Sequence, residues 1–176
     1  VVKRTSIVGF GDIFKGDLGF GCYVVDALCQ EPLGDTVELC YVGANLHYAG
    51  AYCAEMELAV VVGGLCTGGS AGSVHCWEKE TFHRNISWLG EQSHSMRLLA
   101  YSLTRAELGG YSPDELLFLW VEPGTVEGLR ISSAVRKALR KVVGMVKERL
   151  FRRGFLPEAA YRLSSIHQLA VIDTTA

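Results

Sequence analysis

The sequence from Arg4 to Cys29 reads RTSIVGFGDIFKGDLGFGCYVVDALC and decides how the rest of the chain is interpreted. A short β-branched run that ends at Gly9 predicts a buried strand. Beyond it, Tyr23 and Ala27 recur at helical spacing and predict a helix. The five glycines between residues 9 and 21 allow sharp turns at the carboxyl edge of this strand, where open α/β sheets bind ligands. We therefore expect the functional site near residues 11–21.

The glycine-rich loop is similar to two nucleotide-binding motifs but lacks residues that each requires. The dinucleotide motif G-x-G-x-x-G would need a third glycine at Phe14. The phosphate-binding loop would need a lysine followed by serine or threonine, where this chain has Asp17 and Leu18. The next predicted strand ends in Tyr41 and Val42, without the acid that holds a ribose. Nucleotide binding is therefore disfavoured.

The bulk composition predicts an ordinary globular protein. Of its 176 residues, 49% are hydrophobic and 20% are charged, so the chain can bury one sizeable core. The net charge of -2 predicts no general affinity for nucleic acid or for anionic membranes. The longest nearly apolar run, Leu58 to Cys66, is too short for a membrane helix. No export signal is visible at the start, so we expect a cytoplasmic protein.

Strand and helix patterns alternate along the remainder of the chain, which predicts a doubly wound sheet. Predicted strands cover residues 37–42, 58–63, 73–78 and 115–122, and predicted helices cover 43–53, 93–108 and 133–151. Residues 81–93 are interpreted as a loop. The predicted fold class is α/β, with three αβα layers and a twisted, mostly parallel sheet of about five strands. We place one domain at residues 1–153 and a C-terminal tail at 154–176.

Several short motifs follow one another along the chain in a recognisable order. Residues 9–14 match a G-x-G-N-x-L motif and residues 72–75 match G-T-V-H. Further matches lie at Asp17, Gly19, Gly21, residues 37–39, Gly43, Ala44, and residues 60–62 and 121–123. Together these motifs resemble the maturation endopeptidases of nickel-iron hydrogenases. The resemblance covers roughly residues 3–150, and such an ordered series is far more specific than any single motif.

The resemblance implies a function, a partner and a metal. Enzymes of that family recognise nickel in the hydrogenase large subunit and then remove a C-terminal peptide. We therefore expect a nickel-iron hydrogenase large subunit, or a similar protein client, as the partner, and neither nucleic acid nor a membrane. Nickel carried by the client is the expected metal, and no other cofactor is expected.

The metal-binding acids of the family are largely missing when its motifs are carried onto this chain. The family binds nickel through a glutamate, an aspartate and a histidine. The histidine matches His94, whereas the glutamate position holds Leu18 and the aspartate position holds Gly64. A further acidic position, at the end of the second strand, holds Tyr41. Because leucine and glycine side chains have no lone pair, we expect a dismantled metal site and impaired or absent cleavage.

Three functional hypotheses remain open. In the first, the chain engages the C-terminal region of a large-subunit precursor with little or no cleavage. In the second, it is an active nickel-dependent endopeptidase whose metal ligands are Asp17 and His94. In the third, it is a small-molecule binding module. Asp17 is also explained as an acceptor of loop amide hydrogens, and His94 as an ordinary histidine at a helix start.

The predicted crevice lies at the carboxyl edge of the sheet, along residues 11–21, 43–47, 63–68 and 94. Its candidate partner-binding residues are Gly11, Asp12, Gly16, Asp17, Leu18, Gly43, Ala44, Gly63, Gly64 and His94. No catalytic residue is assigned among them.

Overall fold

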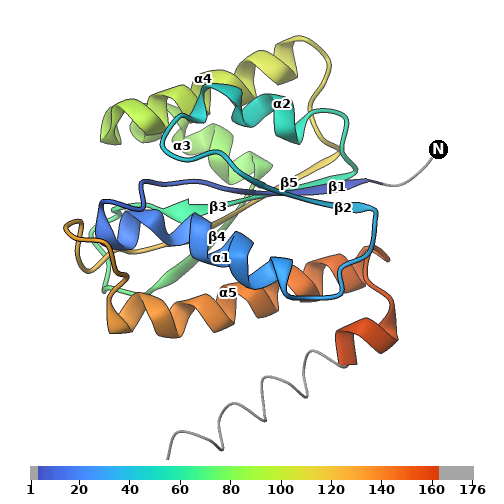
Figure 1. Cartoon of the computed structure of the whole chain (residues 1–176). Coiled ribbons are helices and arrows are strands. Elements are labelled where there is room, and N and C mark those ends of the chain that lie inside the picture. The colour runs from blue at the N-terminus through green and yellow to red at the C-terminus, as the bar shows by residue number, and fades with distance from the viewer. Residues whose placement is uncertain (1–3, 163–176) are drawn as a thin grey trace, which may run out of the picture.

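The computed structural model describes residues 4–162, which form three αβα layers (Figure 1). The central sheet has five strands in the order β2-β1-β3-β5-β4. They are β1 (Thr5–Gly9), β2 (Val37–Tyr41), β3 (Leu58–Gly64), β4 (Val74–Glu78) and β5 (Glu115–Val121). Neighbouring strands are parallel, except that β4 pairs antiparallel with β5 at one edge. The predicted fold class is therefore confirmed.

Helices cover both faces of the sheet (Figure 1). The lower face in the figure carries α1 (Phe20–Cys29) and α5 (Ser133–Arg152). The upper face carries α2 (Ala49–Cys53), α3 (Lys79–Gln92) and α4 (His94–Leu108). Two short 3₁₀ helices, η1 (Gly16–Gly19) and η2 (Leu46–Tyr48), lead into α1 and α2. The three inner strands β1, β3 and β5 are thus almost completely buried, whereas the edge strands β2 and β4 are partly exposed.

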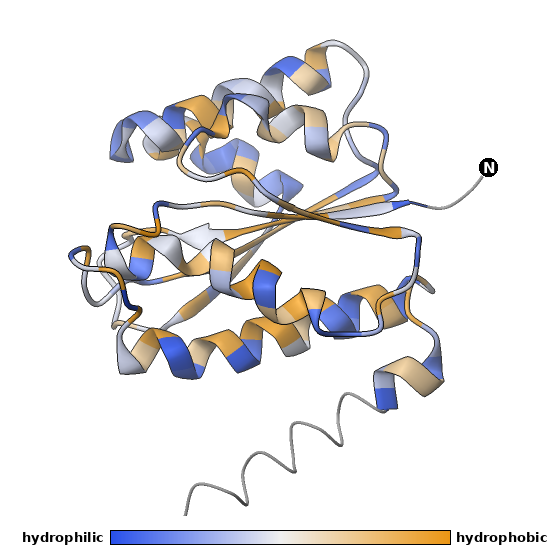
Figure 2. Ribbon diagram, viewed as in Figure 1, coloured by the Kyte–Doolittle hydropathy of each residue, from blue (hydrophilic) through white to orange (hydrophobic). Residues whose placement is uncertain are grey.

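The apolar core lies on both sides of the sheet, and the strands are coloured largely as hydrophobic in Figure 2. Every residue of β3 is buried, as expected for a central parallel strand. Its alternate residues face opposite layers. Val60 and Val62 pack with α1 and α5, whereas Ala59 and Val61 pack with the helices of the other face. This packing fixes the carboxyl ends of β1 and β3, from which the candidate site is built.

The predicted loop at residues 81–93 is wrong, because α3 occupies Lys79–Gln92. Phe82 and Leu89 are buried in the core, and Ile86 packs against the same cluster. These positions are four and three residues apart, which places them on one helical face. Phe82 also stacks on Phe118 of β5, with ring centroids 4.6 Å apart. The other residues of α3 are mostly polar and include poor helix formers, which masked this stripe in the sequence.

The chain beyond α5 continues along the core. Phe155 and Leu156 are buried in the cluster formed by α1, α5 and the sheet, and residues 158–162 are helical. The domain boundary placed at residue 153 stays a prediction, and the rest of the predicted tail lies outside the described residues. From residue 4 to residue 162, none of the helices combines the length and the apolar character needed to cross a membrane.

Candidate functional site at the carboxyl edge of the sheet

The glycine-rich loop between β1 and α1 is shaped by close contacts between backbone segments. Gly11 has a φ of 134°, and a β-carbon there would lie 1.8 Å from the carbonyl oxygen of Leu18. The N–H of Gly11 donates to the carbonyl oxygen of Gly43 at 2.9 Å. The hydroxyl of Tyr41 donates to the carbonyl oxygen of Gly11 at 2.7 Å. Only glycine fits at position 11, so the loop is held against the ends of β1 and β2.

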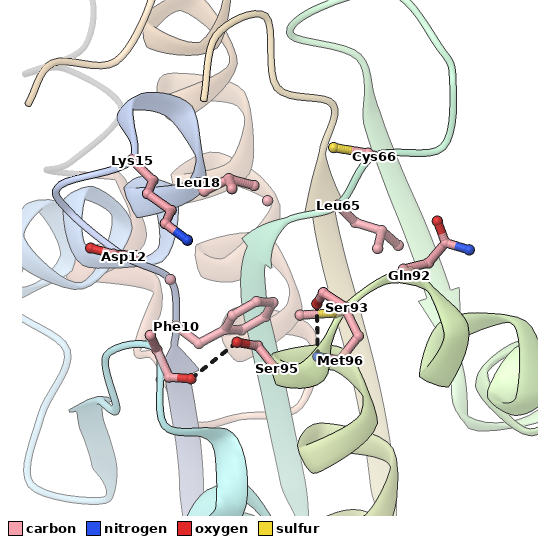
Figure 3. Close-up of a pocket in the computed structure, with 13 residues that line it drawn as sticks. Phe10, Asp12, Lys15, Leu18, Leu65, Cys66, Gln92, Ser93, Ser95 and Met96 are labelled. Atoms are coloured by element: carbon pink, nitrogen blue, oxygen red, sulfur yellow. Dashed lines mark hydrogen bonds between the residues drawn. The ribbon is translucent and has the colours of Figure 1, made fainter. Parts of the chain in front are cut away.

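A cavity of about 250 Å³ opens beside this loop (Figure 3). Its walls come from the glycine-rich loop, the segment that follows β3 and the junction between α3 and α4. Half of the ten candidate crevice residues line it, namely Gly11, Asp12, Leu18, Ala44 and Gly64. The others do not line it, namely Gly16, Asp17, Gly43, Gly63 and His94.

The two positions at which the resemblance predicts metal-binding acids lie against each other in the cavity wall. A β-carbon added to Gly64 would lie 3.3 Å from both the Cα and a δ-carbon of Leu18. The leucine side chain therefore occupies the space beside the glycine. The structure brings the two positions together, but neither side chain carries a metal-binding atom.

Asp17 is fully buried and faces the segment that precedes α5. One carboxylate oxygen accepts the N–H groups of Gly124 and Thr125, at 2.7 and 2.9 Å, and the other accepts the N–H of Ser132 at 2.5 Å. Burial by itself raises the pKa of this carboxyl, but the hydrogen bonds from Ser132, Thr125 and Gly124 hold the pKa below its ordinary value. Asp17 thus accepts amide hydrogens, as the sequence suggested, from residues 107 to 115 positions further along the chain.

His94 is the first residue of α4, and it is exposed. The helix is capped by Ser93, whose hydroxyl accepts the N–H of Met96 at 3.1 Å. Neither His94 nor Asp17 lines the cavity, so the two candidate metal ligands do not meet there. Across residues 4–162, no group of three or more histidine, cysteine, aspartate or glutamate side chains could hold a metal ion.

No family model matches the chain, and no curated protein sequence matches it. Solved structures do match its architecture. The hydrogenase maturating endopeptidase HybD from E. coli matches with a TM-score of 0.76 and 20% identity, over 86% of this chain and 94% of that one. An endopeptidase from Escherichia coli, studied in solution, matches with a TM-score of 0.80 and 20% identity, over 89% and 98% of the two chains. A hydrogenase 2 maturation peptidase from a Thaumarchaeota archaeon matches with a TM-score of 0.61 and 25% identity, over 84% and 98%. This chain has the hydrogenase maturation endopeptidase fold.

The resemblance to hydrogenase maturation endopeptidases is thus confirmed in the fold, but the residues present do not fit a resident nickel ion. Leu18 and Gly64 supply no donor atom, and the carboxylate oxygens of Asp17 are engaged by backbone N–H groups. His94 does not line the cavity, and Asp12, the acid that does, joins no group of three or more potential metal ligands among residues 4–162. A single imidazole holds a divalent ion poorly, so no chemistry at this site is assigned to a bound metal.

Glu122 is a second buried carboxylate near the cavity, and in the sequence it is marked only as part of the motif at residues 121–123. It accepts the hydroxyl of Thr67 at 2.6 Å, the N–H of Thr67 at 2.8 Å and the N–H of Gly68 at 3.2 Å. Burial raises the pKa of this carboxyl, but the hydrogen bonds from Thr67 and the adjoining backbone hold the pKa below its ordinary value. Glu122 therefore fixes the loop that follows β3, next to the cavity.

The remaining cavity residues were harder to predict from sequence. Those outside the predicted ranges are Phe10, Gln92, Ser93, Ser95 and Met96. Most of them belong to the junction of α3 and α4, which was obscured because the preceding residues were interpreted as a loop. Lys15, Leu65 and Cys66 lie within the predicted ranges, but no motif marked them as functional. In Figure 3 the ammonium group of Lys15 points toward the cavity.

Proposed function

We propose that this chain is a hydrogenase maturation protein that engages the C-terminal region of a nickel-iron hydrogenase large-subunit precursor, with impaired or absent proteolytic activity. The fold supports the first half of this proposal. One observation supports the second: Leu18 packs against Gly64 where the family resemblance predicts two acids. The crevice at the sheet edge is retained, and the oxygens that would direct a metal to the scissile bond are replaced.

The two positions where the resemblance predicts acids, Leu18 and Gly64, have residues that fit each other. Leu18 fills the space that a side chain at position 64 would need, because a β-carbon there would already touch its Cα and side chain at 3.3 Å. An acid restored at only one of the two positions would therefore meet either an apolar neighbour or a steric conflict. Metal-directed hydrolysis requires both positions to change together.

An active endopeptidase that uses Asp17 and His94 would need a different arrangement. Asp17 is buried, and it would have to give up its hydrogen bonds from the backbone N–H groups of Gly124, Thr125 and Ser132, which costs about 1–3 kcal/mol. His94 would have to enter a cavity that it does not line. No observation on the described residues favours this alternative.

A small-molecule module is also less well supported. Pockets for drug-sized ligands occupy roughly 300–1,000 Å³. The cavity here has a volume of about 250 Å³, which suits one amino-acid side chain better than a cofactor.

The proposal is tested with a nickel-loaded large-subunit precursor. The expected result is a complex on size-exclusion chromatography, and no loss of the C-terminal peptide by mass spectrometry. If no complex forms with the precursor at micromolar concentrations, client engagement is refuted. Rapid trimming of the precursor would instead refute the loss of activity.

A restoring pair of substitutions tests the reason for inactivity. Leu18→Glu combined with Gly64→Asp should introduce nickel binding that calorimetry can detect, because two carboxylates then share one wall. The matched control is Leu18→Gln combined with Gly64→Asn, which has the same shape without the charges. Equal nickel binding by the two double variants would show that the acids are not what the cavity lacks.

A further inference from the structure

The cavity wall combines apolar surface with one unpaired cation. Phe10, Leu18, Leu65 and Met96 provide apolar wall. Lys15 is exposed at the rim, and its ammonium forms no ion pair or hydrogen bond with any of the residues from 4 to 162. An ammonium beside an apolar cavity favours a ligand that carries a negative charge next to an apolar group.

Asp12 is the carboxylate among the lining residues, and it does not neutralise Lys15. Its Oδ1 accepts the N–H of Phe14 at 2.9 Å, which holds the side chain in a turn of its own loop. In Figure 3 the Asp12 carboxylate points away from the ammonium of Lys15 and from the cavity. Among the residues that line the cavity, the charged group that faces it is therefore the ammonium of Lys15.

The opposite wall also presents hydrogen-bond donors. The cavity reaches Ser93 and Ser95 at the start of α4, a helix of 15 residues. Ser93 accepts the N–H of Met96 through its hydroxyl and that of Arg97 through its carbonyl oxygen. Among residues 4–162 this leaves the N–H groups of His94 and Ser95 without an acceptor at this helix end, where the helix dipole favours a negative charge. A carboxylate in the cavity would thus meet Lys15 from one side and these donors from the other.

We propose that the cavity binds the C-terminal end of a polypeptide, with an apolar last side chain inside and the α-carboxylate against Lys15. The volume of about 250 Å³ matches one residue and its carboxylate rather than a larger ligand. Capture of a C-terminal carboxylate by a cation and backbone N–H groups is a known mode of peptide recognition. This inference rests on the proposed function, because it specifies which part of the client is bound.

Two exposed apolar side chains lie near the backbone of Lys15. Phe14 is 70% exposed and Leu129 is 65% exposed. The backbone of Lys15 forms a bridge with that of Gly128, and Phe14 and Leu129 directly adjoin this bridge in sequence. This apolar surface is available to a bound client.

The test uses short peptides that differ only at the carboxyl group. The probe is the acetylated peptide Gly-Ser-Gly-Ser-Leu with a free C-terminal carboxylate, compared by calorimetry with the same peptide as a C-terminal amide. The acid should bind about tenfold more tightly than the amide, and Lys15→Gln should remove that difference. Lys15→Arg should keep it, and Lys137→Gln on the exposed face of α5 is the matched control.

The outcomes separate this inference from the proposed function. Equal binding of acid and amide, or absence of binding by both, overturns the carboxylate site, whereas client engagement is decided by the precursor experiment. If isovalerate alone binds as tightly as the peptide acid, the site takes a small acid and the polypeptide assignment is overturned. An unchanged acid preference in Lys15→Gln would overturn the role of Lys15.

Discussion

Two groups of positions at the carboxyl edge of the sheet have opposite character. Behind the glycine-rich loop, Asp17 and Glu122 are buried carboxylates whose oxygens accept backbone N–H groups. In the cavity wall, Leu18 and Gly64 occupy positions where acids are expected from the resemblance, and they contact each other instead. The buried carboxylates thus hold loops in place, whereas the side chains of Leu18 and Gly64 in the cavity wall carry no charge. Substitutions at the two groups of positions should therefore have different effects.

The largest effect is expected for Asp17→Asn. The amide keeps the shape of the side chain but turns an N–H₂ group toward backbone N–H donors, so unfolding free energy should fall by about 3 kcal/mol. Urea denaturation followed by circular dichroism measures this. The control is Asp12→Asn, a half-buried carboxylate with a single backbone hydrogen bond, which should cost less than about 1 kcal/mol. An equal decrease in unfolding free energy for both variants would show that the hydrogen bonds accepted by Asp17 contribute no more than the single bond accepted by Asp12.

A smaller loss is expected when Asp17 and Glu122 are protonated, because a carboxylic acid still accepts through its carbonyl oxygen. Burial raises both pKa values, but hydrogen bonds from backbone N–H groups to Asp17, and from the Thr67 hydroxyl and backbone N–H groups to Glu122, hold them below their ordinary values of 3.8 and 4.5. A pKa that is lower in the folded state gives stability that is complete above the unfolded pKa and is lost as the pH falls through the folded pKa. Stability should therefore decrease below about pH 4.5.

Urea denaturation midpoints between pH 2 and pH 7 measure how stability depends on pH. In the double variant Asp17→Asn with Glu122→Gln, stability should depend less on pH. A pH dependence that is unchanged in the double variant would mean that these two carboxyls do not carry the effect.

Substitution at the contact between Leu18 and Gly64 should reduce the unfolding free energy by a smaller amount. Gly64→Ala places a β-carbon 3.3 Å from Leu18, so we expect a loss of about 1 kcal/mol after the entropic gain from removing a glycine. Gly144→Ala in α5, where a β-carbon meets nothing within 4 Å, should instead stabilise the chain by about 0.5–1 kcal/mol. Leu18→Ala should reduce the cost of Gly64→Ala, and a double-mutant cycle by urea denaturation measures this coupling. Strict additivity would argue against the contact.

The smallest effect is expected for His94→Ala. The side chain is exposed and does not line the cavity, so the unfolding free energy should change by less than about 0.5 kcal/mol. Calorimetric titration with nickel should give the same result for the variant and the parent chain. A large loss of nickel affinity on this substitution would restore the hypothesis of an active metal site.

The fold was predictable because its signals are local. The β-branched runs of β1 and β3 and the glycines at their ends mark strands, turns and the ligand edge without knowledge of the tertiary structure. The exception is α3, whose polar composition hid Phe82, Ile86 and Leu89 on one face. With α3 missed, the wall that Gln92 contributes to the cavity was missed as well.

The position of the cavity was predictable, but its lining was predicted only in part. Its place at the carboxyl edge and the adjacency of Leu18 and Gly64 follow from the order of the strands. The partners of Asp17 were not accessible, because the direction of a side chain in a loop depends on contacts with residues far along the chain. Lys15 is a second example, because its sequence neighbours do not reveal that its ammonium lies beside a cavity with no ion-pair partner among residues 4–162.

The hydrogen bonds that Asp17 accepts also constrain the order in which parts of the structure can form. They join the glycine-rich loop to residues 107 to 115 positions later, so the loop stays without its anchor until the chain has been synthesised past Ser132. Contacts of such long sequence separation form late, because loop closure must come first. A nascent chain that stops short of α5 lacks Ser132 and α5, so the glycine-rich loop would be fixed, and the cavity completed, only when synthesis of the domain is nearly finished.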